Sequence, residues 1–291
     1  MTADVTAHYS CNDLIERINA DMKRLGLTRN TITRADLSRL DEFHVGGHGA
    51  TCSFLDNMPP LADGAAKSIT RILDIGCGIG GPARYIADHY GVNVTGVDLS
   101  PDYLRAGTML NDWVGLAPLI TLAQGSATDL PPELGPFDAA IIMHLGMNIR
   151  DKLALFKSAF RVLRPGGYLG IYDVMKQNDG MTTYPLPWAK DSDMDASAAP
   201  AVYHRGLERA GFTITSQRDR SAMALAFFAK ILGDSGNNSA DNSGNNSGPA
   251  PLGLHILMGR DAKIKISNIA SQIASGLFAP TEIIAQKPAL P

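Results

Sequence analysis

The segment best suited to chemistry is a glycine-rich loop, Leu73-Asp74-Ile75-Gly76-Cys77-Gly78-Ile79-Gly80-Gly81-Pro82. A short apolar run leads into it and a helical pattern follows, so the loop joins a strand to a helix. Glycines let the chain turn tightly and let a ligand approach bare backbone, with helix N–H groups behind it. Asp98 follows about 20 residues after Gly76, at the end of the next predicted strand, where a carboxylate can accept both hydroxyls of a ribose. The pattern predicts a site for a ligand that contains a nucleoside.

The charge at the start of this loop narrows the class of ligand that it can bind. Gly76, Gly78 and Gly81 also fit the G-x-G-x-x-G spacing of dinucleotide-binding loops. Asp74 separates the two classes, because an acid repels a pyrophosphate but attracts a sulfonium and an ammonium. S-adenosylmethionine carries both cations and no phosphate, so it is the expected cofactor, and an NAD-dependent oxidoreductase is a minor alternative. In a purely structural alternative, Asp74 caps the turn and Asp98 caps the next helix.

Four segments together resemble the class I S-adenosylmethionine-dependent methyltransferases, over roughly residues 40–230 and again at the last strand. They are the glycine loop, Val97-Asp98-Leu99-Ser100, Gly125-Ser126-Ala127-Thr128-Asp129-Leu130-Pro131 and Leu163-Arg164-Pro165-Gly166-Gly167. The resemblance implies an α/β fold with a Rossmann-like, seven-stranded sheet covered by helices on both faces. It also implies S-adenosylmethionine as methyl donor and S-adenosylhomocysteine as product. The cofactor-binding residues that it implies are Asp74, Gly76, Cys77, Gly78, Gly80, Asp98, Leu99, Ser126, Ala127 and His144.

A further segment, Asp41-Glu42-Phe43-His44-Val45-Gly46-Gly47, resembles the Asp-Gln-Phe-His-x-Gly-Gly stretch of the glycine/sarcosine/dimethylglycine N-methyltransferase group. That group closes this stretch over the cofactor, and here Glu42 stands where Gln is usual. Many relatives also carry an acid for the adenine amino group where this chain has Ser126, which implies that Ala127 and its backbone recognise adenine. The resemblance favours methylation of a small amine or amino-acid nitrogen. O- or C-methylation of a secondary metabolite is the alternative.

The acceptor is expected beyond the carboxyl ends of the strands, where open α/β sheets hold their ligands. His144 follows the fourth predicted strand and is the candidate general base, since an imidazole titrates near neutral pH. The alternative is a packed histidine bonded to backbone. Met147 is as readily a core residue as a ligand contact.

A long irregular stretch after the fifth predicted strand fits a substrate lid. Its Trp188 suits a cationic acceptor by cation–π attraction, or it anchors the lid to the core. Asp191, Asp193 and Asp195 are interpreted as a solvated turn. The expected acceptor-binding residues are Phe43, His44, Met147, Asn148, Tyr172, Trp188 and His204.

Two regions must position these residues. Residues 1–68 lack strand alternation and are predicted to form an N-terminal helical cap, with helices at 12–25 and 34–42 and a Gly/His-rich turn at 43–49. Residues 69–291 alternate strands and helices, which indicates a parallel sheet. Strands are predicted at 71–75, 92–97, 119–123, 137–143, 168–174, 212–217 and 281–285, and helices at 82–90, 102–114, 151–163, 202–210 and 263–275. Residues 233–251 are rich in Asn, Ser and Gly and are predicted to be a disordered insertion.

Composition excludes several classes of function. The 291 residues carry a formal net charge of -3 and are 45% hydrophobic, so bulk charge gives no support to nucleic-acid binding. No apolar run approaches the roughly 20 residues of a membrane span and no secretory signal is visible, so we expect a cytoplasmic protein without a membrane partner. Cys11, Cys52 and Cys77 form neither a disulfide framework nor a zinc pattern, and no metal is expected. The sequence leaves open a homodimer, and also a partner subunit that binds the cofactor without turnover.

Overall fold

The computed structural model describes residues 13–42, 44–62, 69–237 and 261–289. Its strands are β1 (Arg71–Ile75), β2 (Asn93–Asp98), β3 (Ile120–Gln124), β4 (Phe137–Met143), β5 (Leu163–Lys176), β6 (Thr213–Asp219) and β7 (Phe278–Gln286). Its helices are α2 (Leu14–Arg24), α3 (Arg34–Asp41), α4 (Gly47–Asp56), α5 (Gly81–Tyr90), α6 (Pro101–Trp113), α7 (Lys152–Val162), α8 (Pro200–Ala210), α9 (Ser221–Asn237) and α11 (Ala262–Ala274). Within these ranges, no helix combines the length and the apolar character needed to cross a membrane.

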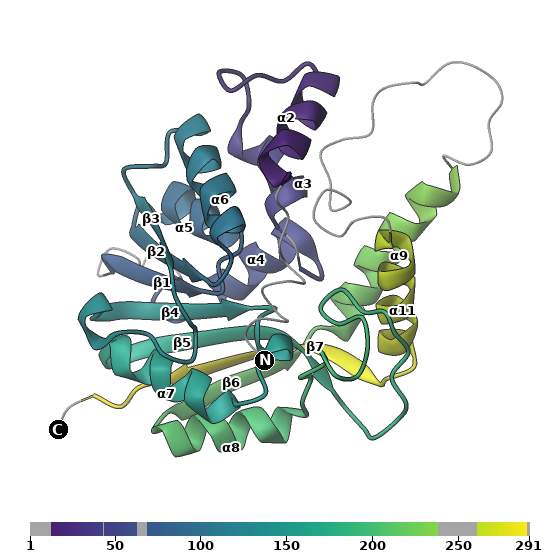
Figure 1. Cartoon of the computed structure of the whole chain (residues 1–291). Helices are drawn as coiled ribbons and strands as arrows, with labels where there is room; N and C mark the ends of the chain where they lie inside the picture. The colour runs from purple at the N-terminus through teal and green to yellow at the C-terminus, as the bar shows by residue number, and fades with distance from the viewer. Residues whose placement is uncertain (1–12, 43, 63–68, 238–260, 290–291) are drawn as a thin grey trace.

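The strands form one sheet in the order β3-β2-β1-β4-β5-β7-β6 (Figure 1). The first five strands of that order pair in parallel, whereas β7 runs antiparallel to both of its neighbours. The order reverses between β1 and β4, which creates the switch point where open α/β sheets bind ligands. The predicted seven-stranded α/β fold is confirmed.

Two apolar clusters fix the layers of the fold. Side chains from one face of the sheet pack against Phe156 of α7 and Leu207 of α8. Side chains from the other face pack against Phe54 of α4 and Ile86 of α5. The strand β4 is apolar except for Asp138 and is buried on both faces, as expected of a central parallel strand. The core thus holds the carboxyl ends of β1 and β4 rigidly side by side.

Most predicted elements are confirmed with bounds shifted by a few residues, but two helices differ from the prediction. The predicted Gly/His-rich turn ends in α4, whose glycines lower helix propensity but whose Phe54 and Leu55 are fully buried in the core. The helix α9 was not predicted, and it extends to Asn237, into the start of the segment predicted to be disordered. Residues 238–251 of that segment lie outside the described residues. Tertiary packing, rather than local helix propensity, therefore stabilises both helices.

A buried ion pair ties the N-terminal helices to the glycine loop. The Arg84 side chain donates from Nε and Nη2 to Asp41 Oδ2 at 3.0 and 2.7 Å, and from Nη2 to the Ile79 carbonyl at 2.7 Å. Arg84 Nη1 donates to Asn111 Oδ1 at 2.8 Å. The Asp41 carbonyl lies so near Gly81 that a Cβ there would stand 2.1 Å from it. Only glycine allows this approach, so the loop and the end of α3 form one unit.

We predict that Arg84→Met lowers the free energy of unfolding by about 3–5 kcal/mol, because it leaves the buried Asp41 carboxylate without its partner. Urea denaturation measures the change. Arg105→Met is the control, since Arg105 is exposed and pairs with Asp102 at the surface, and it should cost less than about 1 kcal/mol. Equal, small effects of the two substitutions would contradict the role given to the buried pair.

Candidate active site

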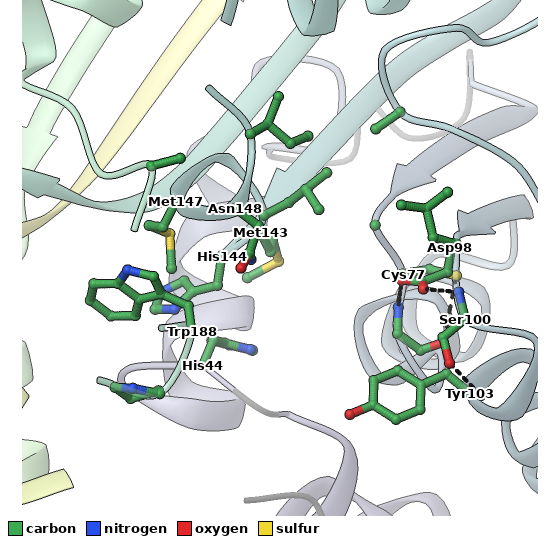
Figure 2. Close-up of a pocket in the computed structure, with 18 of the residues that line it drawn as sticks. His44, Cys77, Asp98, Ser100, Tyr103, Met143, His144, Met147, Asn148 and Trp188 are labelled. Carbon is green, nitrogen blue, oxygen red and sulfur yellow. Dashed lines mark hydrogen bonds between the residues drawn. The ribbon is translucent and has the colours of Figure 1, made fainter. Parts of the chain in front are cut away.

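A cavity of about 870 Å³ opens at the carboxyl ends of β1, β2, β3 and β4, which is near the upper end of the roughly 300–1,000 Å³ of small-molecule sites. The glycine loop and the segments after β2 and β3 line one end of it. The segment after β4, the stretch after β5 and the helices α9 and α11 line the other end. Figure 2 shows the two groups, with Cys77, Asp98 and Tyr103 on one side and His44, His144 and Trp188 on the other. The cavity is thus a single space whose two ends are lined by different kinds of residues.

The glycine loop gives the first end its bare backbone. Gly76, Gly78 and Gly80 have φ angles of 78°, 54° and 83°, in the left-handed region that favours glycine. The N–H groups of Gly76 and Cys77 donate to the Val97 carbonyl, which pins the loop to β2. Gly76 and Gly78 line the cavity, whereas Gly80 lies behind them as the N-cap of α5. A ligand can therefore approach the loop without meeting a side chain at Gly76 or Gly78.

Asp98 lies at the end of β2 and holds the loop as well as facing the cavity. Its Oδ2 accepts a hydrogen bond from the Gly78 N–H at 2.9 Å and its Oδ1 accepts one from the Ser100 N–H at 2.8 Å. Burial raises the pKa of Asp98, and these N–H donors oppose the rise. Each oxygen of the Asp98 carboxylate has a second lone pair, so it can still accept a hydrogen bond from a ribose hydroxyl. Ser100, not Asp98, is the N-cap residue of α6, because its hydroxyl accepts from the Tyr103 N–H.

Asp74 provides a buried carboxylate in which one oxygen lacks a hydrogen-bond partner among the described residues. Only 1% of its surface is exposed, it lines the cavity, and its Oδ2 has no hydrogen bond among the described residues. Burial raises the pKa of Asp74 to about 8, and the nearby Asp98 and Glu42 carboxylates add to the rise. No described lysine or arginine lines this end of the cavity. A buried acid with one open oxygen, beside a bare loop, fits the cationic groups of S-adenosylmethionine and does not fit a pyrophosphate.

The remaining predicted cofactor contacts also line this end. Leu99, Ser126 and Ala127 surround it, and the Ser126 hydroxyl lies 2.9 Å from the Thr128 hydroxyl within its own turn. Cys77 lines it too, and burial raises the pKa of its thiol well above the usual value, so the group stays a thiol. A small, neutral side chain suits the narrow space between two glycines.

The segment that resembles the N-methyltransferase stretch forms a hydrogen-bonded network over α4. Glu42 accepts from the Thr51 hydroxyl at 2.6 Å and lies 3.2 Å from His48 Nδ1. Burial opposes ionisation of Glu42, but hydrogen bonds from His48 and Thr51 leave its pKa below the usual value. His44 lines the cavity, and its Nε2 lies 2.9 Å from the Thr51 hydroxyl. Phe43, a predicted acceptor contact, lies outside the described residues.

His144 stands where the two ends of the cavity meet, with an unusual backbone conformation. It is the one described non-glycine residue with a positive φ, 52°, at the end of β4. Its Nε2 is buried without a hydrogen-bond partner among the described residues. Its ring centre lies 5.6 Å from that of His44 and 5.1 Å from that of Tyr172. Burial and the neighbouring His44 lower the pKa of His144 well below its usual value, so the imidazole is neutral at pH 7 and is a weak base.

Asp173, which sequence reasoning missed, holds the turn that begins at His144. Its carboxylate accepts from the N–H groups of Leu145 and Gly146 at 3.0 and 3.1 Å and from the Tyr203 hydroxyl at 2.9 Å. A Cβ at Gly146 would stand 2.1 Å from Asp173 Oδ2. The only signal in the sequence is one acid inside the apolar strand β5. Asp173 is thus a positioning residue for the turn.

Two predicted acceptor contacts lie elsewhere than expected. Tyr172 is fully buried and does not line the cavity, and its hydroxyl donates to the Val45 carbonyl at 2.9 Å. Its ring packs against the rings of His44 and His144. His204 lies on α8 with its Nε2 against Gln217 of β6, outside the cavity. Met147, Asn148 and Trp188 do line the acceptor end.

The stretch after β5 is organised by an acid that we interpreted as part of a solvated turn. Asp195 accepts hydrogen bonds from Trp188 Nε1 at 3.0 Å, from the Tyr184 hydroxyl at 2.9 Å and from the Ser197 N–H at 2.9 Å. That interpretation is therefore wrong for Asp195, whose half-buried carboxylate fixes the aromatic residues. Sequence reasoning also missed the contribution of α9 and α11 to the cavity wall, although apolar residues recur at helical spacing there.

We predict that cofactor binding releases a proton from Asp74. Its pKa of about 8 in the free protein means that most molecules hold this proton at pH 7, and a bound cation must displace it. Affinity should therefore fall as pH drops below about 8 and should gain nothing from this group above it. Calorimetry with S-adenosylhomocysteine in two buffers of different ionisation enthalpy measures the release. Asp74→Asn should abolish the difference between buffers; equal binding enthalpies in the parental protein would contradict the assignment.

Comparisons of sequence place the chain among methyltransferases. Residues 72–167 match the family model described as a methyltransferase domain. The chain is 29% identical to glycine/sarcosine/dimethylglycine N-methyltransferase of Actinopolyspora halophila, over 56% of this chain and 29% of that protein. It is 31% identical to phosphoethanolamine N-methyltransferase 1 of Zea mays, over 65% and 36%, and 37% identical to the chloroplastic tocopherol O-methyltransferase of Arabidopsis thaliana, over 43% and 36%. The matches span only 29% to 36% of the length of these curated relatives.

Solved structures share the fold. One, from Galdieria sulphuraria and provisionally described as a sarcosine dimethylglycine methyltransferase, has a TM-score of 0.60 at 20% identity and covers 75% of this chain and 78% of that chain. Another, named as the [4+2]-cyclase SpnF, has a TM-score of 0.61 at 22% identity and covers 82% and 81%. At these identities the likeness concerns the fold alone. The chain therefore carries a methyltransferase domain at residues 72–167, within a seven-stranded sheet of the kind found in these solved structures.

Proposed function

We propose that the chain is an enzyme that transfers a methyl group from S-adenosylmethionine to a small-molecule acceptor. The observation that carries the proposal is the continuous cavity, which joins the bare loop with Asp74 and Asp98 to the end that holds His144 and Trp188. When bound, the cofactor supplies the activated methyl group. Asp74 and Asp98 hold it, and the buried Trp188 and Met147 keep water from the acceptor end.

An amine nitrogen is the first candidate for the methylated atom. The resemblance of residues 41–47 and the two N-methyltransferase relatives support it. Asp151, Asp191 and Asp193 line the cavity and attract an ammonium as it enters, and the indole of Trp188 adds cation–π attraction. The amine must lose a proton before it attacks, and it loses that proton to solvent, because the lowered pKa of the buried His144 makes its imidazole a weak base.

A hydroxyl or an acidic carbon is the second candidate, favoured by the unpartnered Nε2 of His144. Such an acceptor depends on a base inside the site, because it reaches the cavity protonated at neutral pH. Among the described residues nothing competes for a hydrogen bond at Nε2, but the lowered pKa makes the imidazole a weak base, so it suits an acceptor whose own pKa is low. Asp173 supports it by fixing the backbone on the carboxyl side of His144.

We predict that S-adenosylmethionine and S-adenosylhomocysteine raise the melting temperature of the protein and that NAD does not. A ligand at 100 times its dissociation constant adds about 2.7 kcal/mol to stability. Asp98→Ala should abolish the shift. Asp129→Ala is the matched control, since this acid follows the neighbouring strand but is 87% exposed, and it should keep the shift. A shift with NAD alone would support an oxidoreductase, and a shift without any methylated product would support a binding subunit.

We predict that His144→Ala lowers kcat with a hydroxyl or carbon acceptor by about 10²- to 10⁴-fold, because the reacting group loses its base. Transfer of a radiolabelled methyl group to panels of amines and phenols measures the effect. The melting shift with S-adenosylhomocysteine should persist in the variant. His204→Ala is the control, since His204 lies outside the cavity. An unchanged rate with phenols in His144→Ala would remove His144 from the mechanism.

A further inference from the structure

We infer that the acceptor has an apolar body and that the helix pair α9 and α11 is the wall that binds it. The inference rests on the proposed methyl transfer and adds the substrate class. It concerns the part of the acceptor that does not react, so it holds for an amine and for a hydroxyl alike. Four features of the structure carry it.

The first feature is the place of the two helices in the chain. The strands β6 and β7 are hydrogen-bonded neighbours that pair antiparallel, from Thr213 with Gln286 to Asp219 with Thr281. A hairpin of about 2–5 residues is enough to join such strands. This chain instead places α9 and α11 between them, and Figure 1 shows the two helices side by side. The two helices pack on the sheet through an apolar cluster with Val174 and Phe278, and they also line the cavity.

The second feature is the face that the helices present. Phe227, Phe228 and Ile231 of α9 and Ile266 and Ile269 of α11 line the cavity. Phe228 and Ile269 are buried and pack with Trp188 and its neighbours in one cluster, which fixes the wall. Phe227, Ile231 and Ile266 are only half-buried and face the open space. Large apolar side chains in that state gain free energy when a ligand covers them with apolar surface.

The third feature is the separation of charge from this wall. Every lining residue that α9 and α11 contribute among the described residues is uncharged and apolar. At the acceptor end, the charged lining residues lie in the segments after β4 and β5, and Arg150, Asp151, Lys190 and Asp193 are exposed to solvent there. Arg150 donates from Nη2 to the Asp193 carbonyl, so its guanidinium is engaged in holding the rim. A free amino acid, charged at both ends, would leave the helix wall in contact with water.

The fourth feature connects the wall to the reacting end. Met223, Phe227 and Ile231 follow one another at four-residue spacing, which places them on one stripe of α9. Met223 packs so closely on Gly46 that a Cβ there would stand 2.6 Å from its sulfur, and the Phe227 ring packs beside Gly47. These glycines follow His44, whose ring neighbours His144. An apolar body laid along α9 therefore directs the polar head of the acceptor toward the two histidines.

The test uses Trp188 as the reporter of acceptor binding. The chain has 2 tryptophans, so Trp113→Phe leaves Trp188, at the cavity, as the single source of tryptophan fluorescence. The probes are two series, 1-alkylamines and 4-alkylphenols, from ethyl to octyl, titrated with S-adenosylhomocysteine at saturation. We expect the dissociation constant to fall about fourfold for each added methylene in both series.

Matched variants locate the effect on the helices. Phe227→Asn and Ile266→Asn should flatten the dependence on chain length. Leu225→Asn and Ile264→Asn should preserve it, because these apolar residues lie on the same helices, do not line the cavity and are 39% and 55% exposed. A dissociation constant independent of chain length overturns the inference, and so does an equal dependence in all four variants. If the cavity variants fail to fold, the chain-length series in Trp113→Phe alone decides.

The outcome for the acceptor class is separate from the outcome for methyl transfer. Loss of the Asp98-dependent melting shift with S-adenosylhomocysteine would sink the proposed function itself. An intact shift with no dependence on chain length would sink only the apolar acceptor.

Discussion

Two carboxylates beside one loop, Asp74 buried and Asp98 partly buried, are the constraint on which the site depends. They stand near the ends of adjacent strands, where the charge of Asp98 adds to the rise in the pKa of Asp74. Asp98 is stabilised by backbone N–H groups, whereas Asp74 keeps an oxygen unpartnered and a raised pKa. In the free protein, ionised Asp74 therefore lacks a full compensating positive charge, and a bound cation supplies it. The buried Arg84, behind the loop, donates hydrogen bonds to Asp41 and only partly offsets the rise in the pKa of Asp74.

The two ends of the cavity are joined mechanically at the switch point of the sheet. The glycine loop follows β1 and the His144 turn follows β4, and a Cβ at Gly76 would stand 2.7 Å from Leu145. Asp173 fixes that turn from the next strand. A shift of the loop is therefore passed to the residues beside His144 through direct contact. Close positioning of two reactants needs this kind of rigidity, because small errors in geometry cost large factors in rate.

The parts of the molecule that could be predicted from sequence are those that depend on local pattern. β1, the glycine loop and β4 follow from short apolar runs and from glycines at fixed spacing, and their placement agrees closely. The helix α4 could not be predicted, because its glycines argue locally against a helix and burial of Phe54 overrides them. The burial of Tyr172, the distance of His204 from the cavity and the bonds of Asp195 depend on contacts between remote segments, which spacing along one strand or loop does not reveal.

The insertion between β6 and β7 has a consequence for how such a fold can diversify. The residues that line the cofactor end come from the segments after β1, β2 and β3 and from the N-terminal helices, and none comes from α9 or α11. The wall that α9 and α11 form at the acceptor end and the residues of the cofactor end thus come from separate stretches of the chain. Mutations can accumulate in the helix pair and reshape the acceptor end while the demanding geometry around the two carboxylates stays intact. Under the proposed function, a lineage with this arrangement can acquire new acceptors while it keeps the methyl donor.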